Sequence, residues 1–338
     1  MKAIVVREFG PPEVMRLEEV PTPVPGPGEV LVQVHAVSVN RTLDLIVRSG
    51  KYARPVKLPH VLGVDPSGVV VAVGEGVKTR KPGDRVASHL RLDSGPVSST
   101  TLIVGVTVWG GYAEYVVLPE RCTFIVPDNL DFPTATVVAR HAPLAFSMLR
   151  DKAKVAPGEW VLVMGAAGGL GSVAVQAAKY LGAKVIVAAG TDERVRAALD
   201  LGGDAGVNYR SADLTAEARR ITGGAGVNVV LENIGDPELF AKAFLALGRD
   251  GRLVTAGSHG GGIVPVNVSH LYLNHITIMG WTGQSDADMN DSLKAASEGR
   301  LRVLVDRVMP LAQAVEAHHI VADRAGLGKV ILQPSVRP

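Results

Sequence analysis

Residues 161–194 read VLVMGAAGGLGSVAVQAAKYLGAKVIVAAGTDER. This stretch predicts a strand ending near Met164, a glycine-rich turn, a helix over about 169–181 and a second strand over 184–189. Glycines remove Cβ atoms from the turn, so backbone N–H groups and the positive end of the helix can approach a pyrophosphate. We therefore predict a dinucleotide-binding turn formed by Ala166, Ala167, Gly168, Gly169, Leu170 and Gly171.

The end of the second strand indicates which dinucleotide binds. NAD sites of this kind carry an acidic residue about 20 positions after the turn, where it accepts hydrogen bonds from the ribose. Here the strand ends in Ala188 and Ala189, so no carboxylate would oppose a 2′-phosphate. Gly190 and Thr191 offer N–H and hydroxyl donors, and Arg194 offers a guanidinium. This pattern favours NADP(H).

Four neighbouring residues bear on the same pocket. Asp192 and Glu193 fit as solvent-facing residues in the first turn of the next helix, where their charge complements the helix dipole. Tyr209 and Arg210 follow the next strand, at the matching edge of a parallel sheet. We expect them to flank the ribose site.

Strands and helical patterns alternate over residues 126–299, which predicts a doubly wound parallel sheet and a cofactor-binding domain. Ligands of such sheets bind beyond the carboxyl ends of the strands. The residues expected there, around the nicotinamide, are Asn233, Ile234, Gly235, Gly257 and Ser258, with Trp281 as a cap.

Residues 1–125 show a different pattern, with β-branched runs separated by Pro- and Gly-rich turns. They predict a small β-rich domain. Residues 300–338 return to strand and loop character and are expected to rejoin it; there Lys329 is expected to reach the cofactor phosphates. Residues 92–109 are expected to form a loop or lobe.

Composition limits the class of protein. A chain of 338 residues suits two domains, and 35 basic against 33 acidic residues give no bias toward nucleic acid or membranes. Cys122 is the single cysteine, so an intramolecular disulfide and a thiolate zinc cage are excluded. No run of about 18 apolar residues occurs and the N-terminus reads as a strand, so we expect a cytoplasmic protein.

Several motifs together resemble the medium-chain dehydrogenase/reductase superfamily over nearly the whole chain. They are KAIVV, VPGPGEVLVQVHAVSVN, LPHVLGVDPSGVVVAVGEGV, KPGDRV, GGYAEYVVLP, AAGGLG and GKVILQP, in family order. The resemblance implies an α/β protein with a GroES-like catalytic domain (1–125 with 300–338) interrupted by a Rossmann NADP(H)-binding domain (126–299). It also implies an active site in the cleft between the domains.

The superfamily contains zinc-dependent and zinc-independent members. Where zinc-dependent members carry a Cys, a His-Glu pair and a third ligand, this chain has Asn40, Val64-Asp65 and Arg140. Asn, Val and Arg cannot replace thiolate and imidazole ligands, and residues 90–109 lack the cysteines of a structural zinc lobe. We therefore predict no metal. An improvised site is the remaining alternative, formed by His60, His89 and His141 with Asp65.

The motifs AAGGLG, TDER and VNYR resemble the zinc-independent quinone oxidoreductase branch. This resemblance implies that Arg194 and Tyr209 bind the 2′-phosphate. Two departures matter. A Thr-Ala/Val-Tyr step beside the nicotinamide is replaced by Leu144-Ala145-Phe146, and VNRTLD (39–44) is one residue longer than its counterpart, which displaces Asn40.

The expected reaction is direct hydride transfer from NADPH to a quinone or an α,β-unsaturated carbonyl. A developing oxyanion needs a donor, and Tyr52 is the first candidate. Asn40 is the second, as a group that orients the carbonyl. Asp44 is expected to pair with Arg48 on a short helix rather than take part in chemistry.

The apolar stretch 275–280 predicts an exposed edge strand, which favours a homodimer, with a tetramer as a further possibility. Two other functions stay open. One is a zinc-free NADP-dependent alcohol dehydrogenase or carbonyl reductase. The other is a non-enzymatic, crystallin-like or RNA-binding protein that holds NADPH, although no basic aromatic stripe supports contact with nucleic acid.

Overall fold

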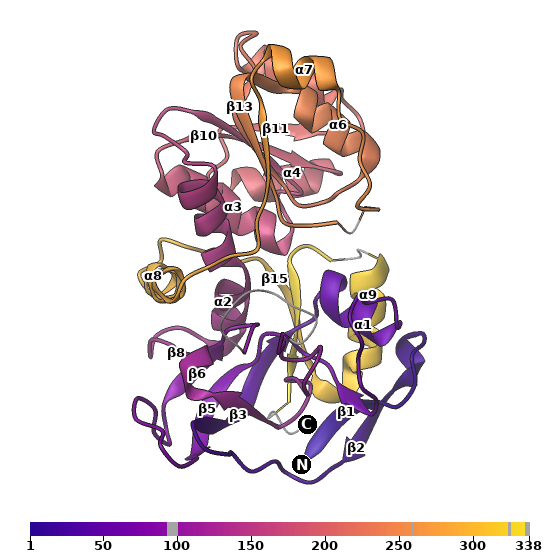
Figure 1. Ribbon diagram of the computed structural model, residues 1–338, viewed down its shortest axis with the longest axis vertical. Helices are drawn as coiled ribbons and strands as arrows, with labels where there is room; N and C mark the ends of the chain where they lie inside the picture. The colour runs from indigo at the N-terminus through magenta and orange to yellow at the C-terminus, as the bar shows by residue number, and fades with distance from the viewer. Residues whose placement is uncertain (93–100, 259, 324–325, 335–338) are drawn as a thin grey trace. The chain divides into compact units, whose positions relative to one another are not determined.

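A computed structural model describes residues 1–92, 101–258, 260–323 and 326–334. The chain divides into two compact units, labelled by element in Figure 1. Unit 1 contains Met1–Arg140, Asn290–Arg300 and Val305–Pro338, and unit 2 contains His141–Met289 and Leu301–Leu304.

Unit 2 is built on a six-stranded sheet whose neighbouring strands are all parallel. Its strand order, β11-β10-β9-β12-β13-β14, reverses direction between β9 and β12. The connections that leave β9 and β12 run in opposite directions along the sheet at this switch point. In such sheets, ligands bind in the crevice beyond the carboxyl ends of these two strands. The strands are β9 (Trp160–Met164), β10 (Lys184–Ala189), β11 (Ala205–Asn208), β12 (Val227–Glu232), β13 (Leu247–Thr255) and β14 (Thr277–Gly280).

The helices between these strands pack on the sheet because this removes their apolar faces from water. α3 contacts β9 and β10, α4 contacts β10 and β11, and α6 contacts β12 and β13. Their starts are set by local chemistry: Asp236 caps α6 by accepting hydrogen bonds from the N–H groups of Glu238 and Leu239, with Pro237 in the first turn. The helices between the strands are α3 (Gly169–Tyr180), α4 (Asp192–Leu199), α5 (Leu214–Ile221), α6 (Pro237–Leu245) and α7 (Val268–Leu273). Helix α8 (Asp286–Ser297) follows β14, and its residues from Asn290 onward belong to unit 1. The parallel sheet with these helices confirms the Rossmann-like half of the predicted α/β fold.

Unit 1 holds the GroES-like β domain. One sheet has the order β2-β1-β4, and the other has the order β15-β16-β3-β5-β6-β8, with β7 also paired to β3. Strand β16 pairs antiparallel with β3, so the last described strand joins the first domain's main strand. The strands are β1 (Lys2–Val6), β2 (Met15–Glu19), β3 (Glu29–Ser38), β4 (His60–Val61), β5 (Ser67–Val73), β6 (Arg85–Ser88), β7 (Tyr115–Pro119), β8 (Thr123–Ile125), β15 (Val305–Pro310) and β16 (Lys329–Gln333).

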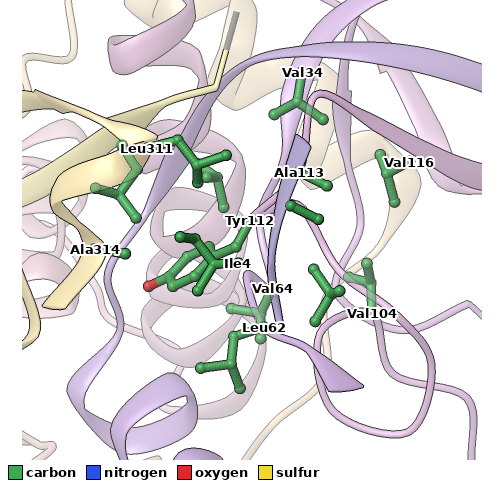
Figure 2. Packing of buried hydrophobic residues seen from close by; sticks show 14 of the residues in the cluster. Ile4, Val34, Leu62, Val64, Val104, Tyr112, Ala113, Val116, Leu311 and Ala314 are labelled. Atoms are coloured by element: carbon green, nitrogen blue, oxygen red, sulfur yellow. The ribbon is translucent and has the colours of Figure 1, made fainter. Parts of the chain in front are cut away.

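The core of unit 1 surrounds Tyr112, which is fully buried. Its ring lies beside Ile4, with Leu311 and Ala314 on neighbouring elements (Figure 2). Its hydroxyl forms a hydrogen bond of 3.1 Å with Nε2 of His318, which satisfies a polar group that burial would otherwise leave unpaired.

Helix α9 (Ala314–Asp323) is not predicted from the sequence, which carries few helix-specific signals there. Residues 300–338 are predicted to hold only strands and loops, and this is wrong for α9, whose residues Ala314, Ala317 and His318 are buried at helical spacing. Helix α1 (Ile46–Arg48) lies in unit 1. Helix α2 (Phe132–Phe146) contains Pro143; its residues up to Arg140 belong to unit 1 and those from His141 belong to unit 2. Of the predicted 92–109 lobe, residues 93–100 lie outside the described residues, and 101–109 form turns with short bridges.

No helix in the described ranges has both the length and the apolar character needed to span a membrane.

Candidate active site and cofactor-binding turn

The glycine turn of unit 2 is shaped as a cradle at the start of α3. Gly165, with φ +59°, begins the turn, and a Cβ on Gly171 would clash with the Gly165 carbonyl oxygen. Gly168 caps α3 without a side-chain hydrogen bond, so no side chain competes for the first N–H groups of the helix. The turn therefore fits a pyrophosphate, whose charge the helix N-terminus favours.

The end of β10 forms the second part of this site. A Cβ on Gly190 would lie 3.2 Å from the Tyr209 hydroxyl oxygen and 3.3 Å from Nε of Arg210, so both side chains lie against this glycine. Thr191 caps α4 by accepting a hydrogen bond from the Arg194 N–H at 3.3 Å. The structure thus places Gly190, Tyr209 and Arg210 together, with Arg194 in the first turn of α4.

Asp192 is the acidic residue nearest to this pocket. Its Oδ1 accepts a hydrogen bond from Nδ2 of Asn208 at 2.8 Å. Glu193 is exposed. Asp192 therefore lies in the first turn of α4 and is bonded to Asn208, the last residue of β11.

The loops after β12 and β13 are held by a buried carboxylate. Glu232 accepts hydrogen bonds from the N–H groups of Ile234 (2.8 Å) and Gly235 (2.9 Å) on Oε1, and from the Thr255 hydroxyl (3.0 Å) on Oε2. Burial raises the pKa of Glu232, while these hydrogen bonds act to lower it. A single side chain therefore fixes the backbone expected to line the nicotinamide.

Close backbone approach explains the glycines of the same loops. Gly235 has φ +68°, and a Cβ there would lie 2.8 Å from Cα of Ser258. A Cβ on Gly257 would clash with the Asn233 carbonyl oxygen. The five predicted residues after these two strands therefore lie together.

Trp281 is also fixed at the carboxyl edge of the sheet. Its backbone N–H donates to the Thr255 carbonyl at 3.0 Å, and its indole Nε1 donates to Oγ of Ser147 at 2.8 Å. The ammonium of Lys152 lies 4.7 Å from the centre of its ring. These contacts hold the ring in one orientation.

Unit 1 contains a buried polar cluster centred on Asn40. Nδ2 of Asn40 donates to the hydroxyl of Ser38 (3.0 Å) and to Oδ2 of Asp65 (3.0 Å), while Oδ1 accepts from Nζ of Lys329 (2.8 Å). Lys329 also donates to the Val39 carbonyl at 2.9 Å. Both amide hydrogens of Asn40 already have acceptors, and its contact with the substrate stays a prediction. The Lys329 ammonium is bonded within unit 1, and its contact with the cofactor phosphates also stays a prediction.

The stretch VNRTLD leads into a π-helical turn over Arg41–Leu45, in which the Leu45 N–H donates to the Asn40 carbonyl at 3.4 Å. This wide turn places the Asp44 carboxylate against the backbone of Asn40 and Gly63. Its oxygens accept from the N–H groups of Asn40 (2.8 Å) and Gly63 (3.0 Å). The expected ion pair between Asp44 and Arg48 is wrong because these backbone groups take the carboxylate.

Arg48 instead contacts a histidine from α9. Its Nη1 lies 3.3 Å from Nδ1 of His318, and Nε2 of His318 contacts the Tyr112 hydroxyl. A guanidinium has only donors, so Nδ1 accepts and Nε2 carries the hydrogen. Burial, followed by the Arg48 charge, lowers the pKa of His318 to about 3.

Burial and neighbouring charges shift the pKa values of the ionisable groups in the Asn40 cluster. Burial raises the pKa of Asp44 to about 7, and the neighbouring Asp65 carboxylate acts in the same direction. Burial lowers the pKa of Lys329 to about 8 against the opposing attraction of Asp65 and Asp44. The cluster therefore balances buried opposite charges in a low-dielectric environment.

The remaining candidates of unit 1 lie around this cluster. Tyr52 is partly buried and packs against the apolar core. Arg140, on α2, is near enough to Asp65, Asp44 and Tyr52 for their charges to act on its pKa, which burial lowers. Over the described ranges, no group of three or more His, Cys, Asp or Glu residues is arranged to hold a metal ion.

Sequence reasoning missed two parts of these sites. Glu232 is absent from the predicted site residues, although an acid that closes a buried parallel strand is a signal that other groups must pair with it. The hydrogen bond between Asn40 and Asp65 leaves no local pattern in the sequence, because these residues are 25 positions apart.

Comparisons with known proteins agree with both units. A family model described as alcohol dehydrogenase GroES-like domain matches residues 26–128, and one described as zinc-binding dehydrogenase matches residues 169–298. The quinone oxidoreductase of Homo sapiens is 32% identical over 98% of this chain and 97% of its own length; that of Sus scrofa is 34% identical over the same shares. A crystal structure of an NAD-dependent alcohol dehydrogenase is 37% identical, with a TM-score of 0.90 over 99% of this chain and 100% of that one.

The chain is therefore a member of the medium-chain dehydrogenase/reductase superfamily, whose oxidoreductases bind a nicotinamide cofactor and act on small molecules. Within it, the chain belongs to the quinone oxidoreductase-like branch.

Proposed function

We propose that this protein is an NADPH-dependent oxidoreductase that works without zinc and transfers a hydride directly to a quinone or an α,β-unsaturated carbonyl. The observation that carries the proposal is the hydrogen bond from Lys329 to Oδ1 of Asn40. Asn40 stands where zinc-dependent relatives carry a thiolate, and a divalent ion would have to displace a bonded ammonium there. Neither Asn40 nor Arg140 supplies the ligand chemistry that Zn²⁺ prefers.

The proposed cofactor is NADP(H), held by unit 2, and when bound it supplies the hydride. The pairing of Tyr209 and Arg210 against Gly190, with Arg194 nearby, supports recognition of a 2′-phosphate. The proposed contacts are Ala166, Ala167, Gly168, Gly169, Leu170, Gly171, Gly190, Thr191, Arg194, Tyr209, Asn233, Ile234, Gly235, Gly257, Ser258 and Trp281, with Lys329 as a further candidate.

Two residues of unit 1 are proposed to act on the acceptor. Tyr52 is the candidate hydrogen-bond donor to the oxygen that gains charge. Asn40 is the second candidate, as the group that orients the carbonyl, and hydrogen bonds to Ser38, Asp65 and Lys329 hold its side chain in place. The proton that completes the reduction comes from solvent or Tyr52.

We also propose a homodimer, a cytoplasmic location, and domains of 1–125 with 300–338 and 126–299. The dimer proposal is supported by β14, an edge strand whose Ile278 is exposed, and by the exposed apolar side chains of Val268, Tyr272 and Leu273 on α7. Sedimentation analysis tests it: we expect a dimer that Ile278→Lys weakens, and a monomer at all concentrations would refute it.

Turnover assays test the main proposal. Purified protein is supplied with NADPH or NADH and with 1,4-benzoquinone, 2-cyclohexen-1-one or an aldehyde, and the metal content of the same sample is measured. We expect NADPH oxidation with the quinone or the enone and no dependence on metal. A stoichiometric transition metal, whose removal by a chelator abolishes activity, would overturn the proposal.

A second function is favoured by one comparison, the 37% identity with an NAD-dependent alcohol dehydrogenase. This alternative is a zinc-free alcohol dehydrogenase or carbonyl reductase. Oxidation of secondary alcohols faster than reduction of enones, under metal-free conditions, would select it.

A further inference from the structure

Arg140 is a partly buried arginine with an unsatisfied donor. Its Nε is closed off from solvent and has no hydrogen-bond partner among the residues that the structure describes. A guanidinium stays charged and offers only donors, so burying it without an acceptor costs free energy. The guanidinium of Arg140 therefore has unused capacity to donate a hydrogen bond to an acceptor oxygen that comes within its reach.

The position of Arg140 follows from its helix. Thr136 lies one turn earlier on α2, and its hydroxyl is 2.5 Å from Oγ of Ser67 and 3.3 Å from the Ala36 carbonyl. Residues four apart share a helix face, so Arg140 extends the same face. Ala36 pairs with Ser67 across β3 and β5. Beyond that pair the two strands lead to Ser38 and Asp65, so Arg140 lies beside the Asn40 cluster.

The carboxylates of this cluster are nevertheless bonded to other groups. Asp65 accepts from the N–H (2.8 Å) and hydroxyl (2.5 Å) of Ser38 and from Asn40. Asp44 accepts from the backbone of Asn40 and Gly63. These acids supply Arg140 with a compensating charge at a distance and leave its donor at Nε unused.

We propose that Arg140 binds the carbonyl oxygen of the hydride acceptor and stabilises the negative charge that collects on it; this inference rests on the proposed reductase function. Two buried acids, Asp44 and Asp65, already balance the buried Lys329 and the partly buried Arg140. A carboxylate ligand would add an uncompensated buried charge, whereas a carbonyl oxygen enters neutral and becomes negative only during reaction.

The step balances without a metal. Hydride adds to the β-carbon of the enone, the C=C electron pair moves to the α-carbon and the oxygen, and the resulting enolate oxygen is bound by Arg140. A proton from solvent or from Tyr52 then adds to the α-carbon, so the acceptor gains two electrons and two hydrogens while NADPH becomes NADP⁺.

A chromophoric acceptor tests this inference without turnover. The absorption of 4-(dimethylamino)cinnamaldehyde moves to longer wavelength when its carbonyl oxygen is polarised. We expect a red shift with the wild type and NADP⁺, none with Arg140→Leu, and a partial shift with Arg140→Lys. Arg85→Leu is the matched control: Arg85 donates to the carbonyls of Asp128 and Leu130 just before α2, so its loss should lower thermal stability and keep the shift. The same shift with Arg140→Leu as with the wild type, or none with the wild type, would overturn the inference.

Kinetics separates this inference from the proposed function. With 2-cyclohexen-1-one, we expect Arg140→Leu to lower kcat/KM by about 100- to 1,000-fold, the usual effect of losing an oxyanion donor, with NADPH affinity unchanged. Millimolar guanidinium should restore part of the activity of Arg140→Ala, which a purely structural role would not allow. If the wild type reduces no acceptor but the chromophore shift still depends on Arg140, the proposed function fails and the carbonyl site stands. Tighter binding of 4-(dimethylamino)cinnamate than of the aldehyde would contradict the charge argument.

Discussion

Nζ of Lys329 donates a hydrogen bond of 2.8 Å to Oδ1 of Asn40, across 289 positions of the chain. The bond joins β16 to the loop after β3 and sets the orientation of the Asn40 amide. That amide in turn donates to Asp65. The closing strand of the β domain thus organises the candidate active site as well as the sheet.

Replacing Lys329 tests this link. We expect Lys329→Met to lower the free energy of unfolding by about 3 kcal/mol, because it leaves Asp65 and Asp44 with less compensating charge in a buried site. Chemical denaturation monitored by circular dichroism measures the change. Lys57→Met, at an exposed lysine, is the control and should change stability by less than about 0.5 kcal/mol. Equal effects of the two substitutions would show that the buried ammonium contributes nothing.

Acid should destabilise the protein in part through His318. The pKa of His318 is about 3 in the folded protein and near 6.5 when unfolded, so the unfolded state binds more protons between these values. The free energy of unfolding should then fall as the pH drops from 6.5 toward 3, by up to about 1.4 kcal/mol per pH unit from this residue alone.

His318→Gln isolates that contribution, since an amide can still accept from Arg48 and donate to Tyr112 without titrating. We expect urea denaturation between pH 4 and pH 7 to show a shallower acid slope for the variant. His60, whose pKa burial also lowers, remains in both proteins and accounts for part of the common slope. Identical slopes would mean that His318 is not buried in its neutral form.

Adding one methyl group should disrupt the cofactor turn. In Gly171→Ala the new Cβ would clash with the Gly165 carbonyl oxygen, which must move together with the start of α3. We expect the Kd for NADPH, measured by nicotinamide fluorescence, to rise at least about tenfold, a change of about 1.4 kcal/mol. Gly280→Ala has open space around its Cβ and should bind NADPH normally. Unchanged affinity in Gly171→Ala would rule out this turn as the pyrophosphate site.

Glu232 should act as a positioning residue for the nicotinamide loops. Glu232→Ala leaves the N–H groups of Ile234 and Gly235 and the Thr255 hydroxyl without their acceptor, so we expect weaker NADPH binding and a lower melting temperature. Glu232→Gln keeps one oxygen for the two N–H groups and offers an amide to Thr255. It should therefore retain most of the affinity, and a loss as large as that of Glu232→Ala would show that charge rather than geometry matters.

Cofactor preference should depend on the cations beside Gly190. We expect Arg194→Gln and Arg210→Gln each to raise the KM for NADPH about 10- to 100-fold and to leave that for NADH nearly unchanged, because each charge-assisted hydrogen bond to a phosphate is worth about 1.5–3 kcal/mol. Steady-state kinetics with both cofactors measures this. Arg196→Gln, later on the same helix, is the control. Equal losses with both cofactors would contradict recognition of a 2′-phosphate.

Much of unit 2 could be predicted because its signals are local. The run before Gly165, the glycines up to Gly171 and the apolar stretch of β10 lie within about 30 residues, and each reflects the geometry of a single strand, turn or helix. The edge position of β14 also followed from its sequence and is confirmed. Helix α9 was missed because its buried face is made of alanines and a histidine, which carry a weak hydrophobic pattern.

The sequence by itself determined the two-domain α/β fold and the glycine turn, since both depend on hydrophobic periodicity and on the absence of Cβ atoms at fixed positions. Only the tertiary structure decided that Asn40 would bond to Lys329 and Asp65, and that Asp44 would hold backbone amides in place of Arg48. The side-chain contacts of Asn40 with Lys329 and Asp65 join residues that are 289 and 25 positions apart in the chain, and burial then sets the charge states of these groups. Neither the contact nor the loss of solvent is encoded in any short stretch of residues.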